Sequence, residues 1–400
     1  MGIETSCDET AAAVVEDGRK ILSNVVVSQI DIFAAYGGVI PEVAARSHLE
    51  AILPVIDKAL KDAHTTWDDI DAIAVTHAPG LLGSLLIGTL TARTLAILHD
   101  KPLYAVHHLK SHVYANWLEG TGEIVLQHSA GPSSQNHNSH GRASGTEIPG
   151  RDRLVCCDFD DCGPRTLQNN SPVPFPILAL VVSGGHTQIL YMPAHNTFEI
   201  IGTTRDDAVG ECFDKVAKIL GLPYPGGPAI ARAAAKGDPN KYKFPHPNVA
   251  NLDFSFSGLK TAVLRTVQRE LNLPLSHPSH DLKNHLTPKQ VADFAASFQK
   301  TAIDILVEKL AKATETYPDI QSIVLAGGVS ANQALRQALE NAYFPEPQFS
   351  GDNGAMVAAA AYYEIISGVT PTDPYALNIY PRISIDNRLT NHSRCDINKE

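Results

Sequence analysis

The chain has 400 residues and a mass of 43.0 kDa, which is above the usual size of a single core and predicts two domains or two lobes. Hydrophobic residues make up 44% and charged residues 19%, a balance that excludes a disordered chain. Six cysteines at irregular spacing do not form a disulfide framework and favour a reducing compartment. Because no apolar run is long enough to span a bilayer, no membrane partner is expected.

The formal net charge of −11 argues against non-specific binding of nucleic acid. The charge is unevenly spread, because Lys and Arg outnumber Asp and Glu between residues 205 and 312, whereas residues 1–150 are acidic. A mildly basic middle region permits a local surface that faces a polyanion, and the alternative explanation is ordinary scatter of charge.

Short strands and helices alternate in the first third of the chain, which indicates an α/β fold. Asp17-Gly18 lies between two β-rich runs and is typical of a hairpin turn. The first predicted helix has one apolar face that contains Leu49, Ile52 and Leu53. The predicted elements are strands at 2–5, 11–15 and 21–27, a helix at 49–60, a strand at 71–76 and a buried helix at 85–98.

The composition changes sharply between residues 127 and 174, where Ser, Asn, Gly, His and Pro dominate and apolar periodicity is lost. This predicts a polar, low-complexity insertion between an N-terminal lobe at 1–126 and a C-terminal lobe at 175–400. A zinc site in the tract is a weaker alternative, because no Cys-x-x-Cys pair is present. Its candidate ligands would be Cys156, Cys157, Cys162, His128, His137 and His140.

Regular secondary structure is predicted again after the insertion. The predicted elements are an apolar strand at 177–182, a small polar turn that ends at Thr187, and a second strand up to Met192. The start of the chain has the same sequence of features, so the pattern predicts a duplicated core. A long amphipathic helix begins near Val291, and a strand at 323–325 leads into a glycine turn.

Three polar turns follow predicted strands. Thr5–Thr10 carries hydroxyls and carboxylates, and Ser183-Gly184-Gly185 allows several backbone N–H groups to approach one anion. Gly327-Gly328 precedes a predicted helix that carries Asn332 one turn from its start. Any one of these turns could be a polar hairpin tip. Their repetition after apolar strands favours a nucleotide or phosphate site.

His108 and His112 have the spacing of two residues on one helix face, which suits two ligands of one metal ion. Asp352 lies at a glycine-flanked turn before an apolar helix and can supply a third, anionic ligand. Such a set leaves coordination positions open for substrate oxygens. The alternatives are an ordinary helical His pair and a helix-capping Asp352.

Two further segments carry polar groups at predicted helix starts. Asp214 shares a helix face with Asp207 and Gly210 and can bind a ribose or an amine. The run 254–261 places hydroxyls between aromatic residues, and its alternative is a packed junction between a strand and a helix.

Together these motifs resemble the tRNA N6-adenosine threonylcarbamoyltransferase family, whose members were once described as O-sialoglycoprotein endopeptidases. They occur in the family's order and span nearly the whole chain outside the insertion. The sequence departs from the family pattern at Phe349-Ser350-Gly351, just before Asp352. The motifs are 2–10, 107–112, 182–187, 206–215, 224–228, 254–261, 327–332 and 352–356.

The resemblance implies a duplicated actin-like ATPase fold, with two lobes around a nucleotide cleft and a final helix that returns toward the N-terminal lobe. It implies one divalent metal ion, iron or zinc, held by His108, His112 and Asp352. No catalytic residue is assigned, and Asp8 and Glu9 are candidates for the base. The implied substrate-binding residues are Val181, Val182, Ser183, Gly184, Gly185, Asp214, Gly227 and Asn332.

The implied reaction transfers a threonylcarbamoyl group from threonylcarbamoyl-AMP to N6 of adenosine 37, in tRNAs that read codons beginning with A. It needs a polarised carbonyl and a stabilised leaving phosphate, which a cation and a glycine turn can supply. The implied partners are tRNA and a second copy of the chain in a homodimer. The opening Glu-Thr-Ser-Cys-Asp-Glu resembles the bacterial and organellar branch. With the insertion it predicts a mitochondrial protein, otherwise a cytoplasmic one; a mitochondrial member is expected to carry a transit peptide, which is not visible in this start.

Two other functions compete with this one. A metalloprotease would explain the His pair, but Leu109-Lys110-Ser111 supplies no Glu between the two ligands. A regulatory module that binds an adenylate without transferring any group would explain the three turns equally well.

Overall fold

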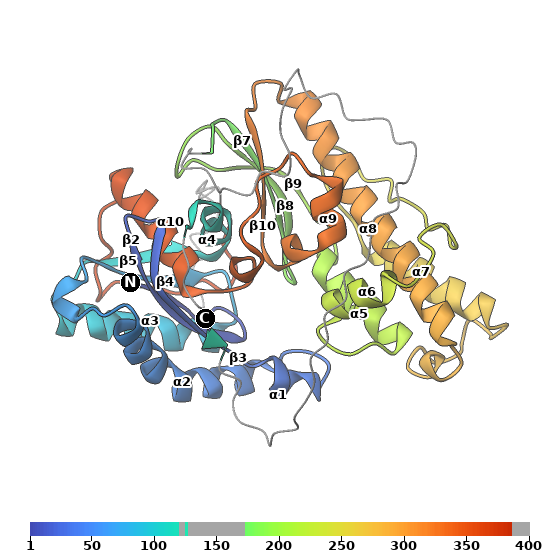
Figure 1. Ribbon diagram of the computed structural model, residues 1–400, viewed down its shortest axis with the longest axis horizontal. Coiled ribbons are helices and arrows are strands. Elements are labelled where there is room, and N and C mark those ends of the chain that lie inside the picture. Colours follow the sequence, from blue (N-terminus) through green and yellow to red (C-terminus); the bar gives the residue numbers. More distant parts are fainter. Residues whose placement is uncertain (120–124, 127–172, 386–400) are drawn as a thin grey trace, which may run out of the picture.

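Two β-sheets form the frame of the computed structural model, which describes residues 1–119, 125–126 and 173–385 (Figure 1). Most of the predicted insertion at 127–174 lies outside the described residues, as does the cysteine and histidine cluster within it. Among the described residues, no helix combines the length and apolar character that crossing a bilayer requires.

The first sheet has the strand order β5-β4-β1-β2-β3-β6. Strands β1 to β3 form an antiparallel meander, and β4 pairs in parallel with β1. Asp17 and Gly18 have φ of 51° and 66°, so the predicted hairpin turn is confirmed. The strands are β1 (Gly2–Glu4), β2 (Glu9–Glu16), β3 (Lys20–Ser28), β4 (Ile73–Ala78), β5 (Leu103–His107) and β6 (Val125–Leu126).

The second sheet has the order β10-β7-β8-β9 and repeats the arrangement of the first. Again three strands form an antiparallel meander, and its first strand pairs in parallel with a later one. The duplicated core predicted from the two strand-turn-strand openings is therefore confirmed. The strands are β7 (Ile177–Val182), β8 (Thr187–Met192), β9 (Glu199–Thr203) and β10 (Ser322–Ala326).

The helices and the two sheets form five layers (Figure 1). Helices α2 and α3 cover one face of the first sheet, α4 and α10 lie between the two sheets, and α5 to α8 cover the far face of the second sheet. The helices are α1 (Ile30–Ala34), α2 (Pro41–Asp62), α3 (Leu82–Leu98), α4 (His108–Tyr114), α5 (Val209–Leu220), α6 (Gly226–Ala234), α7 (Ser257–Glu270), α8 (Pro288–Thr316), α9 (Gln333–Ala338) and α10 (Gly354–Ile366).

Strand β7 shows how the layers arise from the sequence. Its residues point alternately to the two faces of the sheet. Leu178, Leu180 and Val182 pack under α5 to α8, while Ile177, Ala179 and Val181 pack toward α4 and α10. A continuous apolar run is therefore required, because both faces of the strand are buried. Burial of each Leu, Ile or Val side chain in this strand stabilises the fold by about 1.5–3 kcal/mol.

The predicted burial of α2 and α3 is wrong in part. In α2 the buried face runs through His48, Ile52 and Ile56, whereas Leu49 and Leu53 are 65% and 61% exposed. Successive helix positions differ by about 100°, so apolar residues next to the buried stripe turn away from the sheet. Together with three exposed residues of α3 they form what we call the leucine face, which comprises Leu49, Leu53, Leu82, Leu86 and Leu90.

Candidate active site

A cavity of about 2310 Å³ lies between the two lobes. The first lobe contributes the β1–β2 turn and His108, and the second contributes the β7–β8 turn and the starts of α5 and α6. All three predicted polar turns therefore line one cleft. The motif residues that line it include Ser6, Cys7, Asp8, Glu9, His108, Ser183, Gly184, Gly185, Asp214, Gly227, Gly328, Asn332 and Asp352.

Helix α4 brings His108 and His112 together. It follows β5 directly, and Nδ1 of His107 accepts a hydrogen bond from the Leu109 backbone N–H at 3.2 Å, which caps the helix start. Every residue of α4 is buried. The ring centroids of His108 and His112 lie 4.6 Å apart, as the spacing of four residues predicts.

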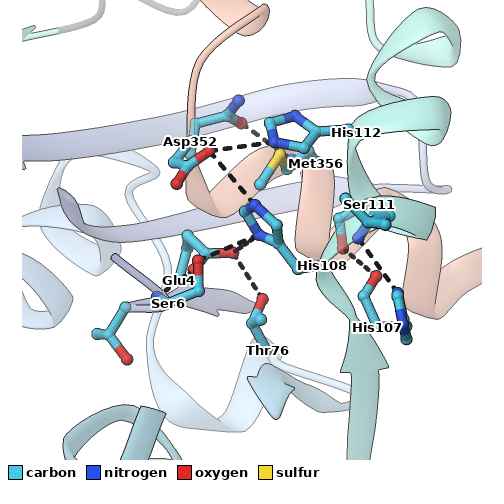
Figure 2. A network of polar contacts seen from close by, with 12 residues as sticks. Glu4, Ser6, Thr76, His107, His108, Ser111, His112, Asp352 and Met356 are labelled. Carbon is cyan, nitrogen blue, oxygen red and sulfur yellow. Dashed lines mark hydrogen bonds and ion pairs between the residues drawn. The ribbon is translucent and has the colours of Figure 1, made fainter. Parts of the chain in front are cut away.

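Asp352 reaches the same point from the start of α10. Its Oδ1 lies 3.1 Å from Nε2 of His112 and 3.6 Å from Nε2 of His108 (Figure 2). The capping role considered for Asp352 belongs to Asn353, whose side chain accepts a hydrogen bond from the Met356 backbone N–H. The Asp352 carboxylate is therefore free of the helix and faces the two imidazoles.

These three residues, which we call the cleft triad, fit a divalent metal ion. Their ligand atoms all lie within 4.8 Å of one another. The His112 side chain is buried, and its Nε2 meets Asp352 Oδ1 at 3.1 Å without the alignment of a hydrogen bond, so this nitrogen has no hydrogen-bond partner among the described residues. An unpaired buried nitrogen costs about 1–3 kcal/mol, and a metal ion would remove that cost. Two neutral imidazoles and one carboxylate suit zinc or iron rather than magnesium or calcium.

Glu4 orients His108 from beneath. Its fully buried carboxylate lies 3.1 Å from Nδ1 of His108 and accepts a hydrogen bond from the Thr76 hydroxyl at 2.6 Å (Figure 2). With Nδ1 engaged in this way, Nε2 is the nitrogen that faces Asp352. The sequence analysis did not identify Glu4 as part of the site, because a carboxylate within a strand gives no signal until the strand is placed beside α4.

The charges of the cleft triad shift its pKa values. Burial lowers the pKa of His108, but the Asp352 and Glu4 carboxylates outweigh burial and raise it to about 9. Burial raises the pKa of Asp352, but His108 and His112 outweigh it and hold it below the usual value. At neutral pH the metal-free protein therefore keeps a proton on His108 that a metal ion must displace.

Two more carboxylates lie in the β1–β2 turn. Burial raises the pKa of Asp8 above its usual value, and the negative charge of Asp352 raises it further. Burial and the charge of Asp8 raise the pKa of Glu9 well above its usual value, although the Ser28 hydroxyl donates a hydrogen bond to Glu9 at 3.1 Å. Carboxyl groups with raised pKa values in a cleft are typical of acid–base chemistry.

The β7–β8 turn presents backbone to the cavity. The Ser183 hydroxyl accepts a hydrogen bond from the His186 backbone N–H at 3.1 Å, and a Cβ placed on Gly184 or Gly185 would meet open space. Gly184 and Gly185 therefore offer room for an anion close to the chain. Val181 and Val182, also predicted as substrate-binding, are fully buried in β7 and do not line the cavity.

Asp214 and Gly227 lie on the second lobe's side of the cleft. Asp214 Oδ1 accepts a hydrogen bond from the Gly226 backbone N–H at 2.7 Å, which joins α5 to the start of α6. Both Asp214 and Gly227 line the cavity, as the predicted substrate-binding role requires.

Asn332 differs from its expected position. It caps α9 instead of lying one turn inside a helix, since its Oδ1 accepts hydrogen bonds from Ala334 and Leu335. Its Nδ2 donates to Gln299 at 2.9 Å. The residue lines the cavity, but its amide is already engaged by the protein.

The 254–261 segment is the packed junction considered as its alternative. Phe254 and Phe256 are fully buried. Asp206 accepts hydrogen bonds from the Ser255 and Ser257 hydroxyls at 2.5 and 2.7 Å. These hydroxyls thus tie the 206–215 segment to the start of α7.

Comparison with known proteins agrees with this site. The family model described as tRNA N6-adenosine threonylcarbamoyltransferase matches residues 20–136 and 164–359, and the gap in the match lies inside the predicted insertion. The curated protein of that name from Symbiobacterium thermophilum is 44% identical over 378 residues, which cover 92% of each chain. The one from Bacillus cereus (strain ATCC 14579) is 42% identical over 398 residues, which cover 96% of each chain.

A solved structure of HypF from T. kodakarensis is similar at 13% identity and a TM-score of 0.48, over 80% of this chain and 44% of that one. The curated matches extend over nearly the whole chain, and the family model covers most of it. The chain belongs to the tRNA N6-adenosine threonylcarbamoyltransferase family.

Proposed function

We propose that this protein transfers a threonylcarbamoyl group to N6 of an adenosine in tRNA and so forms N6-threonylcarbamoyladenosine. The observation that carries the proposal is the cleft itself, which sets a metal-binding triad across from an open glycine turn. The curated relatives bear the name of this activity, and the chain matches them over nearly their whole lengths. The proposed target of the transfer is adenosine 37 of tRNAs that read codons beginning with A.

We infer that the cleft triad holds one divalent metal ion, zinc or iron. When bound, such an ion supplies a Lewis acid that polarises a carbonyl or neutralises phosphate charge. Glu4 holds His108 with Nε2 toward the ion position, and burial of α4 keeps both imidazoles in place. The unaligned contact of the buried His112 Nε2 with Asp352 supports this proposal.

The proposed donor is threonylcarbamoyl-AMP. The backbone of Gly184 and Gly185 would bind its phosphate, because the turn is open and follows a strand. Asp214 and Gly227, which lie in the same lobe as the turn, would bind the nucleoside. A cavity of about 2310 Å³ has room for this molecule and for an adenosine of the tRNA.

We propose Asp8 as the group that accepts the proton of the attacking amine. Asp8 lines the cleft, and its raised pKa makes it a better base than an ordinary aspartate. Burial raises the pKa of the neighbouring Glu9 well above its usual value.

The tRNA would approach over the basic region at 205–312. Lys236, Lys241 and Lys243 are exposed, and Arg232 beside them lines the cavity. Phosphate contacts of this kind fix the register of a nucleic acid.

The leucine face supports a homodimer. A cluster of exposed leucines on two adjacent helices is unusual for a monomer surface, and the same face on a second copy would complete a four-helix packing.

We also propose that the protein works in mitochondria, on the support of the opening motif and the long insertion. Fractionation of cells that express the tagged protein tests the location.

The activity is tested by mixing metal-loaded protein with threonylcarbamoyl-AMP and unmodified tRNA and then digesting the tRNA to nucleosides. N6-threonylcarbamoyladenosine is expected. A folded, metal-loaded sample that yields none would overturn the proposal, and an Asp8→Asn variant that transfers at the wild-type rate would overturn the role of Asp8. Full transfer by a variant carrying His108→Ala and His112→Ala would overturn the metal's role.

A further inference from the structure

Three residues in the second lobe form another compact group of metal-ligand side chains. His277, Asp281 and His285 follow α7 at intervals of four residues, and their ligand atoms all lie within 4.8 Å of one another. We call them the loop triad. Asp281 comes just before the short 3₁₀ helix η3 (Leu282–Asn284). None of the three lines the cleft.

The two imidazoles converge on a single carboxylate oxygen. Nε2 of His277 lies 2.9 Å and Nε2 of His285 lies 3.0 Å from Asp281 Oδ2. The rings stand nearly perpendicular, with their centroids 5.6 Å apart. Zinc binds imidazole nitrogen at about 2.0–2.1 Å and carboxylate oxygen at about 2.0–2.2 Å. An ion among the three atoms would therefore need only small side-chain rotations.

The backbone around the loop triad is held independently of its side chains. Gln268, which is buried in α7, donates hydrogen bonds to the carbonyls of Leu275 and His277 at 3.2 and 3.1 Å. Leu282 is fully buried in the core beneath α5. The loop is therefore anchored on both sides of Asp281, which lowers the entropy cost of gathering three ligands.

One further contact fixes the carboxylate. Asn284 Nδ2 donates to Asp281 Oδ1 at 2.8 Å, which leaves Oδ2 for the two histidines. Ordered support of a ligating carboxylate in this way is typical of metal sites. The side chains of His277, Asp281 and His285 are 20%, 37% and 44% exposed, so water can reach the group and complete a tetrahedral shell.

We propose that the loop triad is a second metal site, which binds zinc or a similar divalent transition metal and has a structural role. Two imidazoles and one carboxylate favour such ions over magnesium and calcium, which prefer oxygen ligands. The bound ion would join the end of α7 to η3, which packs under α5, the helix that carries Asp214. Without an ion the same residues form a hydrogen-bonded His-Asp-His group, and that is the competing description.

Zinc content separates the two descriptions. Metal-free protein is loaded with zinc, freed of weakly bound ions on a chelating resin and analysed by mass spectrometry. A variant carrying His277→Ala and His285→Ala should hold one zinc fewer per chain than the wild type. His280→Ala, which changes an exposed histidine of the same loop, should hold as much as the wild type. Equal zinc in the loop-triad variant and the wild type would overturn the proposal.

Hydrogen exchange provides a second measurement that does not depend on the cleft. In a variant carrying His108→Ala and His112→Ala, zinc should still slow amide exchange across residues 275–286. Adding the two loop substitutions should abolish that protection. If the doubly substituted loop fails to fold, His285→Gln replaces the most exposed ligand alone and should lower zinc affinity at least tenfold. Unchanged exchange on zinc addition would rule out the site, whatever the outcome of the tRNA assay.

Discussion

Glu4 Oε2 lies 3.1 Å from Nδ1 of His108 and joins the first strand of the protein to the helix that carries two of the three cleft-triad residues. The Thr76 hydroxyl donates to the same oxygen, and the Ser6 backbone N–H donates to Oε1. Each oxygen of the buried carboxylate thus has a partner. The arrangement allows only one imidazole tautomer to ligate a metal ion.

Glu4→Gln should weaken metal binding by about 10–100-fold, the usual effect of losing a partner that orients a ligating histidine. A glutamine amide can donate to Nδ1, which would place the remaining ring proton on Nε2 and block ligation. Metal affinity is measured by competition with a coloured chelator, and circular dichroism checks the fold. Glu16→Gln, at an exposed end of β2, is the matched control. Equal affinities of the Glu4 variant and the wild type would contradict the orienting role.

Metal affinity should rise with pH. The raised pKa of His108, about 9, means that below this pH a metal ion must displace a proton from its imidazole. Each pH unit between 6.5 and 8.5 should therefore increase the apparent affinity about tenfold on account of His108. Titration of the metal at three pH values tests this, and a flat profile would show that His108 is not a ligand.

The metal-free protein should show the opposite trend in stability. Because the pKa of His108 is higher in the folded state than the unperturbed 6.5, its contribution to stability is complete below about pH 6.5 and is lost as the pH rises through about 9. Denaturant unfolding of chelated protein at pH 6.5 and 9.5 measures the change. His108→Asn should reduce this difference, whereas His64→Asn, on an exposed turn, should leave it unchanged.

Gly210→Ala should distort the glycine turn. A Cβ at Gly210 would lie 2.6 Å from the Ser183 carbonyl oxygen and 2.9 Å from Gly184 Cα, so α5 and the turn must separate. We expect a loss of about 1–3 kcal/mol in the free energy of unfolding and weaker binding of AMP-containing ligands in calorimetry. Gly258→Ala is the control, because its Cβ meets open space. Wild-type affinity in the Gly210 variant would show that the turn does not hold the phosphate.

Charges on the leucine face should prevent dimerisation. Leu49→Glu combined with Leu86→Glu places carboxylates at two exposed positions of adjacent helices, where a second copy would have to desolvate them. Light scattering after gel filtration should give the monomer mass for this variant and the dimer mass for the wild type. Leu275→Glu changes an equally exposed leucine of the other lobe and should remain a dimer. A monomeric wild type would refute the proposed homodimer.

The fold was predictable where local signals are strong. The β-rich runs on either side of the Asp17-Gly18 turn located the meander of the first sheet, and the repeated strand-turn-strand pattern located the second. The burial of α2 was harder to predict, because Leu49 and Ile52 are equally apolar and only packing against the sheet decides which one is covered.

The sequence was sufficient to predict which residues form the site, but not which neighbouring residues hold them in place. The helical spacing of His108 and His112 and the isolated carboxylate of Asp352 carried enough chemistry to be found in the sequence. The roles of Glu4 and Asn353 required the tertiary structure, since each is defined by a partner far along the chain or by one dihedral angle at a helix start. Asn332 was misplaced for the same reason: helix boundaries are uncertain by a few residues.

The five-layer arrangement separates the two halves of the site. His108 and His112 belong to α4 and Asp352 to the start of α10, two helices that pack against each other between the sheets, whereas the glycine turn, Asp214 and Gly227 belong to the second lobe. A hinge motion between the lobes that kept α4 packed on α10 would open the proposed nucleotide site while leaving the three proposed metal ligands together. Under the proposed function, release of the adenylate product would then not require release of the proposed ion.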